Sequence, residues 1–232
     1  MVLMPTLVVV RHGLSTSNVE GTLAGRTLGV QLTEAGRSQA MGVGERLRGI
    51  SFTHVVVSRL RRCAETWELL SETAGIWTNP RIDDRALEAD YGDWTGRPLS
   101  ELVTEPLWQT ILTRPSEVRF PGGESMLETR ERVLDLVRDL NADSGTEDTW
   151  LLVTHGDPIK MILSDALGAP FDEFQRVVVD PASISVVHYV EGGKPLVIAM
   201  NTLEGQIRRR LPPGMQHPQL GGGVGAFEDD DE

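Results

Sequence analysis

Three short apolar runs constrain the fold of this chain more than any other feature. They are Thr6–Val10, His54–Ser58 and Trp150–Thr154. Apolar runs of this length, with no polar residue at every second position, are typical of strands buried on both faces of a sheet. Two later runs, at about 183–190 and 196–202, indicate a hairpin with a Glu-Gly-Gly-Lys turn between its strands.

Segments with helical spacing separate these runs. A helix is expected to begin near Thr33, because the apolar residues after it recur on one face. A second helix covers 60–70, and a third begins at Ser125–Glu128, a Ser-x-x-Glu capping box. A fourth follows the third apolar run, with Asp157 as its cap and Pro158 in its first turn. This alternation predicts an α/β fold, a three-layer sandwich whose central sheet is mostly parallel and carries helices on both faces.

The rest of the chain is less regular. Residues 76–123 contain five prolines, and there we expect a short strand near 77–82, long loops and one short helix near 99–112. From residue 211 the chain is rich in proline and glycine and then acidic, a composition that cannot bury a core. The predicted organisation is a single domain over 1–210 and a disordered tail over 211–232.

Composition excludes several classes of protein. The 232 residues carry 22 basic and 34 acidic side chains, a formal charge of −12. Five of the acids lie at 228–232, which leaves −7 on the rest, and an acidic body argues against nucleic acid or an anionic membrane as partner. A single cysteine, Cys63, excludes an internal disulfide and a cysteine-based zinc site. We find neither an apolar run of roughly 18–20 residues nor a signal peptide, so we expect a cytoplasmic protein.

Two histidines stand at the ends of predicted strands, and each is followed by glycine. They are His12 and His155, before Gly13 and Gly156. Ligands of parallel sheets bind beyond the carboxyl ends of the strands, where a glycine would let a substrate approach the imidazole. Together the two histidines could supply a nucleophile and a positive hydrogen-bond donor, and Arg11 adds a fork that suits phosphate or carboxylate. The alternative is that one of them is a strand-end residue with no ligand.

Three arginines cluster at the start of the second predicted helix, where the helix dipole favours anions. The helical spacing places Arg62 near the buried side, able to point across the strand ends. Arg59 and Arg61 are expected to be exposed. A solvated basic face is the alternative interpretation of the whole cluster.

An acidic and aromatic loop follows the predicted strand near residue 80. Ala86–Gly96 groups three acidic residues, Glu88, Asp90 and Asp93, with two aromatic residues and two glycines. This composition is typical of a loop at a binding site. Taken alone, an ordinary surface loop remains the alternative.

These segments together resemble the histidine phosphatase superfamily, the group of phosphoglycerate mutases and related phosphatases. Arg11–Asn18 is similar to the family signature Arg-His-Gly-x-Ser-x-x-Asn. Four further motifs of the family have similar segments here in the same order, at Leu32–Gly36, Ser58–Thr66, Leu87–Gly96 and Thr154–Gly156. The resemblance covers about residues 6–203. Arg59 departs from it, because the family usually has proline or a small residue there.

The resemblance implies a role for each matching residue. His12 would accept the phosphoryl group, and Arg11, Arg62 and His155 would hold its oxygens. Glu88 would be the general acid that protonates the leaving oxygen, helped by burial or by an anionic neighbour such as Asp90. The remaining positions that would contact substrate are Asn18, Ala24, Gly25 and Gly156. Three cations around one phosphoryl group stabilise its transfer without a metal ion or other cofactor.

Three activities are compatible with these residues. In a phosphatase, water attacks the phosphohistidine; in a mutase, the phosphoryl group returns to another substrate oxygen; a non-catalytic phosphate-binding module is the third. The segment Pro121–Ser125, and the shortness of the chain between Glu88 and His155, resemble the broad-specificity phosphatase branch. We therefore expect a phosphatase that acts on a small phosphorylated metabolite, of sugar phosphate or phosphoglycerate type.

Two features stay open. A homodimer through an edge strand or a helix is compatible with the sequence. Six residues of the irregular stretch could line a lid or could be core aromatics and solvated arginines, namely Tyr91, Trp94, Arg97, Trp108, Arg114 and Arg119.

Overall fold

A mixed six-stranded sheet forms the centre of the computed structural model, which describes residues 3–145 and 147–207. Its strands are β1 (Leu3–Arg11), β2 (His54–Val57), β3 (Arg81–Ile82), β4 (Thr149–Thr154), β5 (Ile184–Val190) and β6 (Leu196–Thr202). They are arranged in the order β3-β2-β4-β1-β5-β6. Every pair is parallel except β1 with β5 and β5 with β6, so β5 alone runs against the others in this sheet. The predicted α/β fold with a mostly parallel sheet is confirmed.

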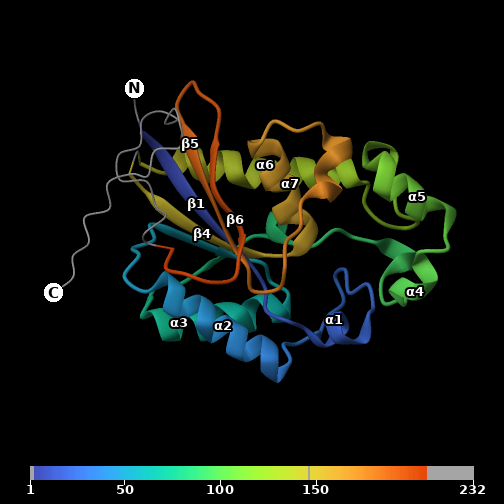
Figure 1. Cartoon of the computed structure of the whole chain (residues 1–232), viewed down its shortest axis with the longest axis horizontal. Helices are drawn as coiled ribbons and strands as arrows, with labels where there is room; N and C mark the ends of the chain where they lie inside the picture. The colour runs from blue at the N-terminus through green and yellow to red at the C-terminus, as the bar shows by residue number, and fades with distance from the viewer. Residues whose placement is uncertain (1–2, 146, 208–232) are drawn as a thin grey trace.

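The helices lie on both faces of the sheet and beyond one end of it (Figure 1). The α-helices are α1 (Thr16–Glu20), α2 (Glu34–Leu47), α3 (Arg61–Ala74), α4 (Leu99–Leu102), α5 (Pro106–Thr113), α6 (Met126–Asp143) and α7 (Gly156–Ala166). Short 3-10 helices complete the list: η1 (Asp84–Ala86), η2 (Gly92–Trp94), η3 (Pro115–Glu117) and η4 (Phe171–Arg176). Helices α2 and α3 cover one face and α6 and α7 the other, while α1, α4 and α5 lie beyond the end of the strands.

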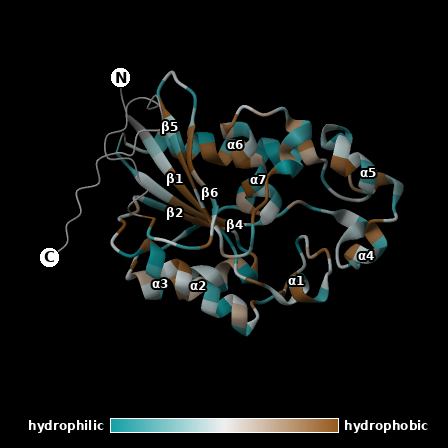
Figure 2. Ribbon diagram, in the orientation of Figure 1, coloured by the Kyte–Doolittle hydropathy of each residue, from teal (hydrophilic) through white to brown (hydrophobic). Residues whose placement is uncertain are grey.

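Alternate side chains of the central strands point to opposite faces of the sheet and pack into two separate cores. Leu7 and Val9 of β1 pack with α6 and α7, whereas Val8 and Val10 pack with α2 and α3. All four are fully buried, which explains why the run shows no polar alternation. The apolar strands between more polar helix surfaces are visible in Figure 2. A third core mixes aromatic and aliphatic side chains and includes residues of α4, α5 and η4.

The predicted start of a helix is confirmed at the two positions where a side chain caps the helix. Thr33 caps α2, and Ser125 forms the expected capping box with Glu128 at the start of α6. The prediction for Asp157 is wrong: α7 begins at Gly156, its N-cap is His155, and Asp157 lies in its first turn.

The irregular stretch differs from prediction in two places. The strand near 77–82 is reduced to β3, and the single helix over 99–112 is two helices, because Pro106 starts a new one at α5. The short helix α1 was not predicted. The expected tail over 211–232 lies outside the described residues.

Candidate active site

Strand register brings the two predicted histidines together. Arg11 of β1 pairs with Thr154 of β4, so the next residues, His12 and His155, emerge side by side at the carboxyl edge of the sheet. Their ring centroids are 5.3 Å apart in an edge-to-face arrangement, and both rings are buried. A cavity of about 460 Å³ opens at this edge and is lined by His12.

The contacts of His12 define its tautomer. Arg62 Nε lies 3.2 Å from His12 Nε2, and a guanidinium can only donate, so Nε2 accepts and carries the lone pair. The other nitrogen, Nδ1, then bears the hydrogen and donates to the carbonyl oxygen of Gly13 at 2.8 Å. Burial, followed by the charges of Arg62 and Arg11, holds the pKa of His12 well below its ordinary value. The ring is therefore neutral, as a nucleophile must be.

His155 is oriented by a serine from the neighbouring strand. Its Nε2 lies 2.7 Å from the hydroxyl of Ser58, the residue that follows β2. Burial, then the charge of Arg62, lowers the pKa of His155 well below its ordinary value. The predicted positive donor is thus a neutral imidazole, and it lies buried behind His12, outside the residues that line the cavity. An anion bound beside the ring would favour the protonated form, because an opposite charge stabilises an imidazolium.

Two guanidinium groups line the cavity beside His12. Arg62 is 1% exposed; its Nη2 donates to the carbonyl of Gly25 at 2.8 Å, and its buried Nη1 has no partner among the described residues. Arg11 Nη1 donates to the carbonyl of Val179 at 2.5 Å, and its buried Nε likewise has no described partner. A buried donor left without an acceptor costs about 1–3 kcal/mol. Two such donors at one cavity indicate a place prepared for an anion.

The other arginines of the cluster face solvent. Arg59 and Arg61 are more than half exposed and pair with Asp84 and Glu65. The helical spacing therefore distinguished the inward Arg62 from its two neighbours.

Glu88 is buried at the same cavity, on the stretch between η1 and η2. Burial, and then the charge of Asp157, raises its pKa to about 7. The expected anionic neighbour, Asp90, does not supply this effect: its carboxylate accepts from Gly92 N and lies 3.7 Å from Arg26. Asp157 faces the cavity instead of capping its helix, and it accepts a 2.8 Å hydrogen bond from the hydroxyl of Tyr91.

Two arginines that sequence reasoning missed hold the backbone of Glu88. Its carbonyl oxygen accepts from Arg26 Nε at 3.0 Å and from Arg132 Nη2 at 2.9 Å. Both arginines also bind the carboxylate of Glu124, at 2.7 Å from Arg26 and 3.0 Å from Arg132. We call Glu88, Arg26, Arg132 and Glu124 together the Glu88 clamp. Glu124 belongs to the Pro-Gly-Gly-Glu-Ser segment, which was the available signal.

Glycines let the Glu88 loop and the Glu124 segment touch backbone to backbone. A Cβ on Gly92, whose φ is +51°, would lie 2.1 Å from the carbonyl oxygen of Pro121. A Cβ on Gly123 would lie 2.3 Å from the carbonyl oxygen of Asp90. Any side chain at either position would push the two segments apart.

The remaining predicted substrate contacts also line the cavity, namely Asn18, Ala24, Gly25 and Gly156. Asn18 lies on α1, where its Oδ1 accepts from the backbone and hydroxyl of Ser15. Glycine is required at position 13 by packing and not by access of a substrate, because a Cβ there would lie 2.4 Å from the carbonyl oxygen of Gly36.

The aromatic residues of the irregular stretch divide between cavity and core. Tyr91 lines the cavity, whereas Trp94 and Trp108 stack in the third core. Their arginine neighbours do not line it and pair with nearby glutamates instead; these are Arg97, Arg114 and Arg119.

Comparison with known proteins agrees with this geometry. Residues 7–202 match the sequence profile of the Histidine phosphatase superfamily (branch 1). The chain belongs to this superfamily. It is 35% identical over 186 residues to the probable phosphoglycerate mutase GpmB of Salmonella choleraesuis, which covers 79% of this chain and 84% of that protein.

Solved structures share the fold of this superfamily member. Bacillus stearothermophilus YhfR superposes with a TM-score of 0.78 at 27% identity, over 86% of this chain and 100% of that one. A mycobacterial glucosyl-3-phosphoglycerate phosphatase gives a TM-score of 0.74 at 26% identity, over 85% of this chain and 98% of that one. The names of the relatives divide between a mutase and a phosphatase, so the choice between these reactions depends on the cavity.

Two kinds of feature were searched for in residues 3–145 and 147–207. No group of three or more His, Cys, Asp or Glu side chains is arranged there to hold a metal ion. None of the helices described is both long enough and apolar enough to cross a membrane.

Proposed function

We propose that this superfamily member is a phosphomonoesterase that works through a phosphohistidine at His12 and needs no metal ion. The observation that carries the proposal is the arrangement of Arg62. Arg62 lines the cavity, one guanidinium nitrogen lies 3.2 Å from Nε2 of His12, and another is buried with no partner among the described residues. A phosphoryl group bound there would satisfy the free donors of Arg62 and Arg11.

In the first step, His12 Nε2 attacks phosphorus and the bond between phosphorus and the ester oxygen breaks. Glu88, with a pKa near 7, gives its proton to the leaving oxygen, so an alcohol departs. Arg11, Arg62 and His155 donate hydrogen bonds to the three remaining oxygens, whose charge is greatest in the transition state.

In the second step, water attacks the phosphohistidine. The Glu88 carboxylate takes a proton from that water, the bond between nitrogen and phosphorus breaks, and inorganic phosphate leaves. His12 returns to its neutral form with the lone pair on Nε2. The contacts proposed for substrate are completed by Asn18, Ala24, Gly25 and Gly156, which line the cavity.

A phosphoglycerate mutase is the second candidate, favoured by the name of the GpmB relative. It shares the first step and differs in the acceptor of the phosphoryl group, which is a substrate hydroxyl in place of water.

For partner and location, we propose a small phosphorylated metabolite and the cytoplasm. The formal charge of −12 disfavours nucleic acid and anionic membranes as partners. The buried free thiol of Cys63 fits a reducing compartment.

The test is to trap the intermediate. Brief incubation with phosphate-labelled substrate and an alkaline quench should leave acid-labile label on His12, and EDTA should not reduce turnover. His12→Ala should abolish label and turnover, while the control His54→Ala, outside the cavity lining, should retain both. Label on a serine, or turnover by His12→Ala near wild type, would refute the proposal. A parallel assay of 2- and 3-phosphoglycerate interconversion identifies a mutase.

A further inference from the structure

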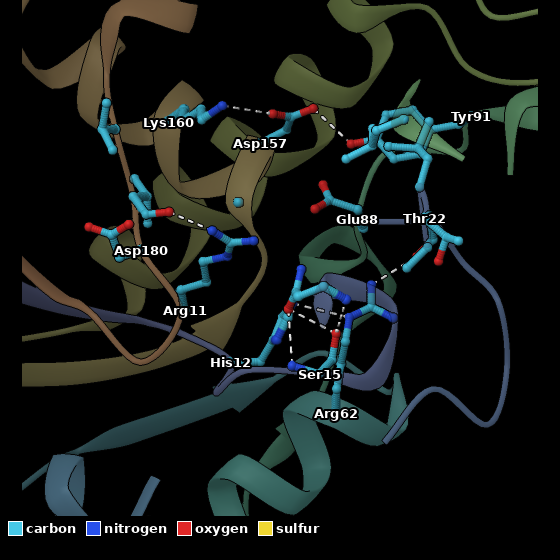
Figure 3. Close-up of a pocket in the computed structure, with 18 of the residues that line it drawn as sticks. Arg11, His12, Ser15, Thr22, Arg62, Glu88, Tyr91, Asp157, Lys160 and Asp180 are labelled. Atoms are coloured by element: carbon cyan, nitrogen blue, oxygen red, sulfur yellow. Dashed lines mark hydrogen bonds and ion pairs between the residues drawn. The ribbon is translucent and has the colours of Figure 1, made fainter. Parts of the chain in front are cut away.

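The wall of the cavity opposite the phosphoryl site carries a different set of charges. In Figure 3, Arg11, His12 and Arg62 lie on one side, and Asp157 and Lys160 lie across the cavity from Arg62. Asp180 is also in the lining, on the segment that follows η4. We call four residues of the cavity lining that lie outside the phosphoryl site the leaving-group wall, namely Asp157, Lys160, Gln175 and Asp180.

The positive charge of Lys160 is paired with a negative charge within this wall. Its Nζ lies 3.6 Å from Asp157 Oδ1 and donates a 3.0 Å hydrogen bond to Gln175 Oε1. Its side chain is 23% exposed and that of Asp157 is 13% exposed, so water screens the pair only in part. Of the basic side chains in the cavity lining that the structure describes, Lys160 alone lies outside the phosphoryl site.

Asp180 adds a negative charge that no described cation pairs with. Its Oδ2 accepts from Asn201 Nδ2 at 2.7 Å, and its own backbone N–H donates to Asn201 Oδ1 at 2.7 Å. These reciprocal bonds fix the orientation of Asp180, a residue of the cavity lining. The wall therefore carries one positive charge, on Lys160, and two negative charges, on Asp157 and Asp180.

We infer that the cavity selects a leaving group that is uncharged and hydroxylated, and discriminates against one that carries a carboxylate or a second phosphate. This inference rests on the proposed function. The charges of Arg11 and Arg62 are matched by the transferred phosphoryl group, and Lys160 by Asp157, so a second anion would meet Asp180 without a free cation. Hydroxyl groups, in contrast, can donate to Asp180 and to Asp157.

Glycerol 3-phosphate and 3-phosphoglycerate provide a matched test, because they differ in a hydroxymethyl group against a carboxylate. We expect kcat/KM of the wild-type protein to be at least about tenfold higher for glycerol 3-phosphate, as a like-charge contact in a partly buried site implies. Added salt should narrow the gap. Asp180→Asn should narrow it about fivefold or more, whereas Asp135→Asn, on the exposed side of α6, should leave the ratio as it is.

Each other outcome has a clear meaning. Hydrolysis of 3-phosphoglycerate that equals or exceeds that of glycerol 3-phosphate overturns the inference and leaves the proposed phosphatase activity intact. If Lys160→Gln then loses the hydrolysis of 3-phosphoglycerate, Lys160 binds the carboxylate. An unchanged ratio in Asp180→Asn overturns the role given to Asp180. Absence of hydrolysis with both substrates and with nitrophenyl phosphate overturns the proposed function and this inference together.

Discussion

The Nη2 atom of Arg132 donates a 2.9 Å hydrogen bond to the backbone carbonyl of Glu88 and lies 3.0 Å from the carboxylate of Glu124. Neither Arg132 nor Glu124 lines the cavity. They act on Glu88 through its backbone, which fixes where its carboxyl group stands relative to His12. The acid proposed for catalysis thus depends on residues that touch no substrate.

Loosening the Glu88 clamp should slow proton transfer more than phosphoryl transfer. Arg132→Gln is expected to lower kcat for an alkyl phosphate about tenfold or more, with little change in KM, because placement of the acid is lost while the phosphoryl site is kept. Nitrophenyl phosphate, whose leaving group needs no proton, should be affected less. Arg138→Gln, on the same helix but paired only with exposed Asp135 among the described contacts, is the control. Equal losses for both substrates would mean that Arg132 supports only the fold.

The inward and outward arginines of α3 should differ sharply. Arg62→Ala removes a buried donor aimed at the phosphoryl group and is expected to lower kcat/KM by about 10²–10³. Arg61→Ala removes an exposed partner of Glu65 and should cost less than about threefold. Steady-state kinetics of the two variants, side by side, check this. Comparable losses would place the phosphoryl site elsewhere.

Local signals predicted the central strands and the capped helices, because an apolar run or a capping side chain acts within a few residues. They failed where the decisive contact is distant in sequence. The backbones of Gly92 and Gly123 are in contact although the two residues are about thirty positions apart in sequence. No sequence pattern near either glycine predicts this contact. Asp157 was predicted to cap a helix, but its carboxylate instead accepts a hydrogen bond from the distant hydroxyl of Tyr91.

The same limit applies to the candidate site. His12 and His155 were predictable because each ends an apolar strand, and the register of β1 with β4 then makes them neighbours. Arg132 was not, because one arginine in a helix carries no local mark of its role. Glu124 lies in the segment Pro121–Ser125, which the sequence singled out, but nothing in that segment indicates contact with Glu88. Only the folded chain shows that both converge on Glu88.

The general acid should be revealed by the leaving group. Glu88→Gln is expected to slow alkyl phosphates by about 10²-fold or more and nitrophenyl phosphate far less, because a poor leaving group needs the proton most. Asp90→Asn and Asp93→Asn should show no such split, since neither side chain lines the cavity. Kinetics of all three variants on both substrates distinguish the candidates. A split in an aspartate variant, with none in Glu88→Gln, would transfer the role.

The pH profile should respond to Asp157. The groups that act on the Glu88 carboxyl are Asp157, Arg62 and Arg11, together with burial and the N–H of Ala89. Of these, burial and Asp157 raise its pKa, so Asp157→Asn should lower that pKa and move the alkaline fall of kcat to lower pH. For an alkyl phosphate, the rate at pH 7.5 should drop about threefold or more relative to the rate at pH 5.5. An unmoved profile would contradict this coupling.

The raised pKa of Glu88 also carries a stability cost that can be measured. In the folded protein the pKa is about 7, against an ordinary 4.5, so between these pH values the folded state binds more protons than the unfolded state. Stability therefore falls as pH rises from about 4.5 to 7, and above pH 7 the full cost is on the order of 3 kcal/mol. Glu88→Gln removes the ionisation and should raise the urea midpoint of unfolding at pH 8 while changing it little at pH 4.5. Asp93→Asn, an exposed residue of the same loop, should not show this pH-dependent gain. If Glu88→Gln is no more stable than wild type at pH 8, the carboxyl is not held in the unfavourable environment that its proposed role requires.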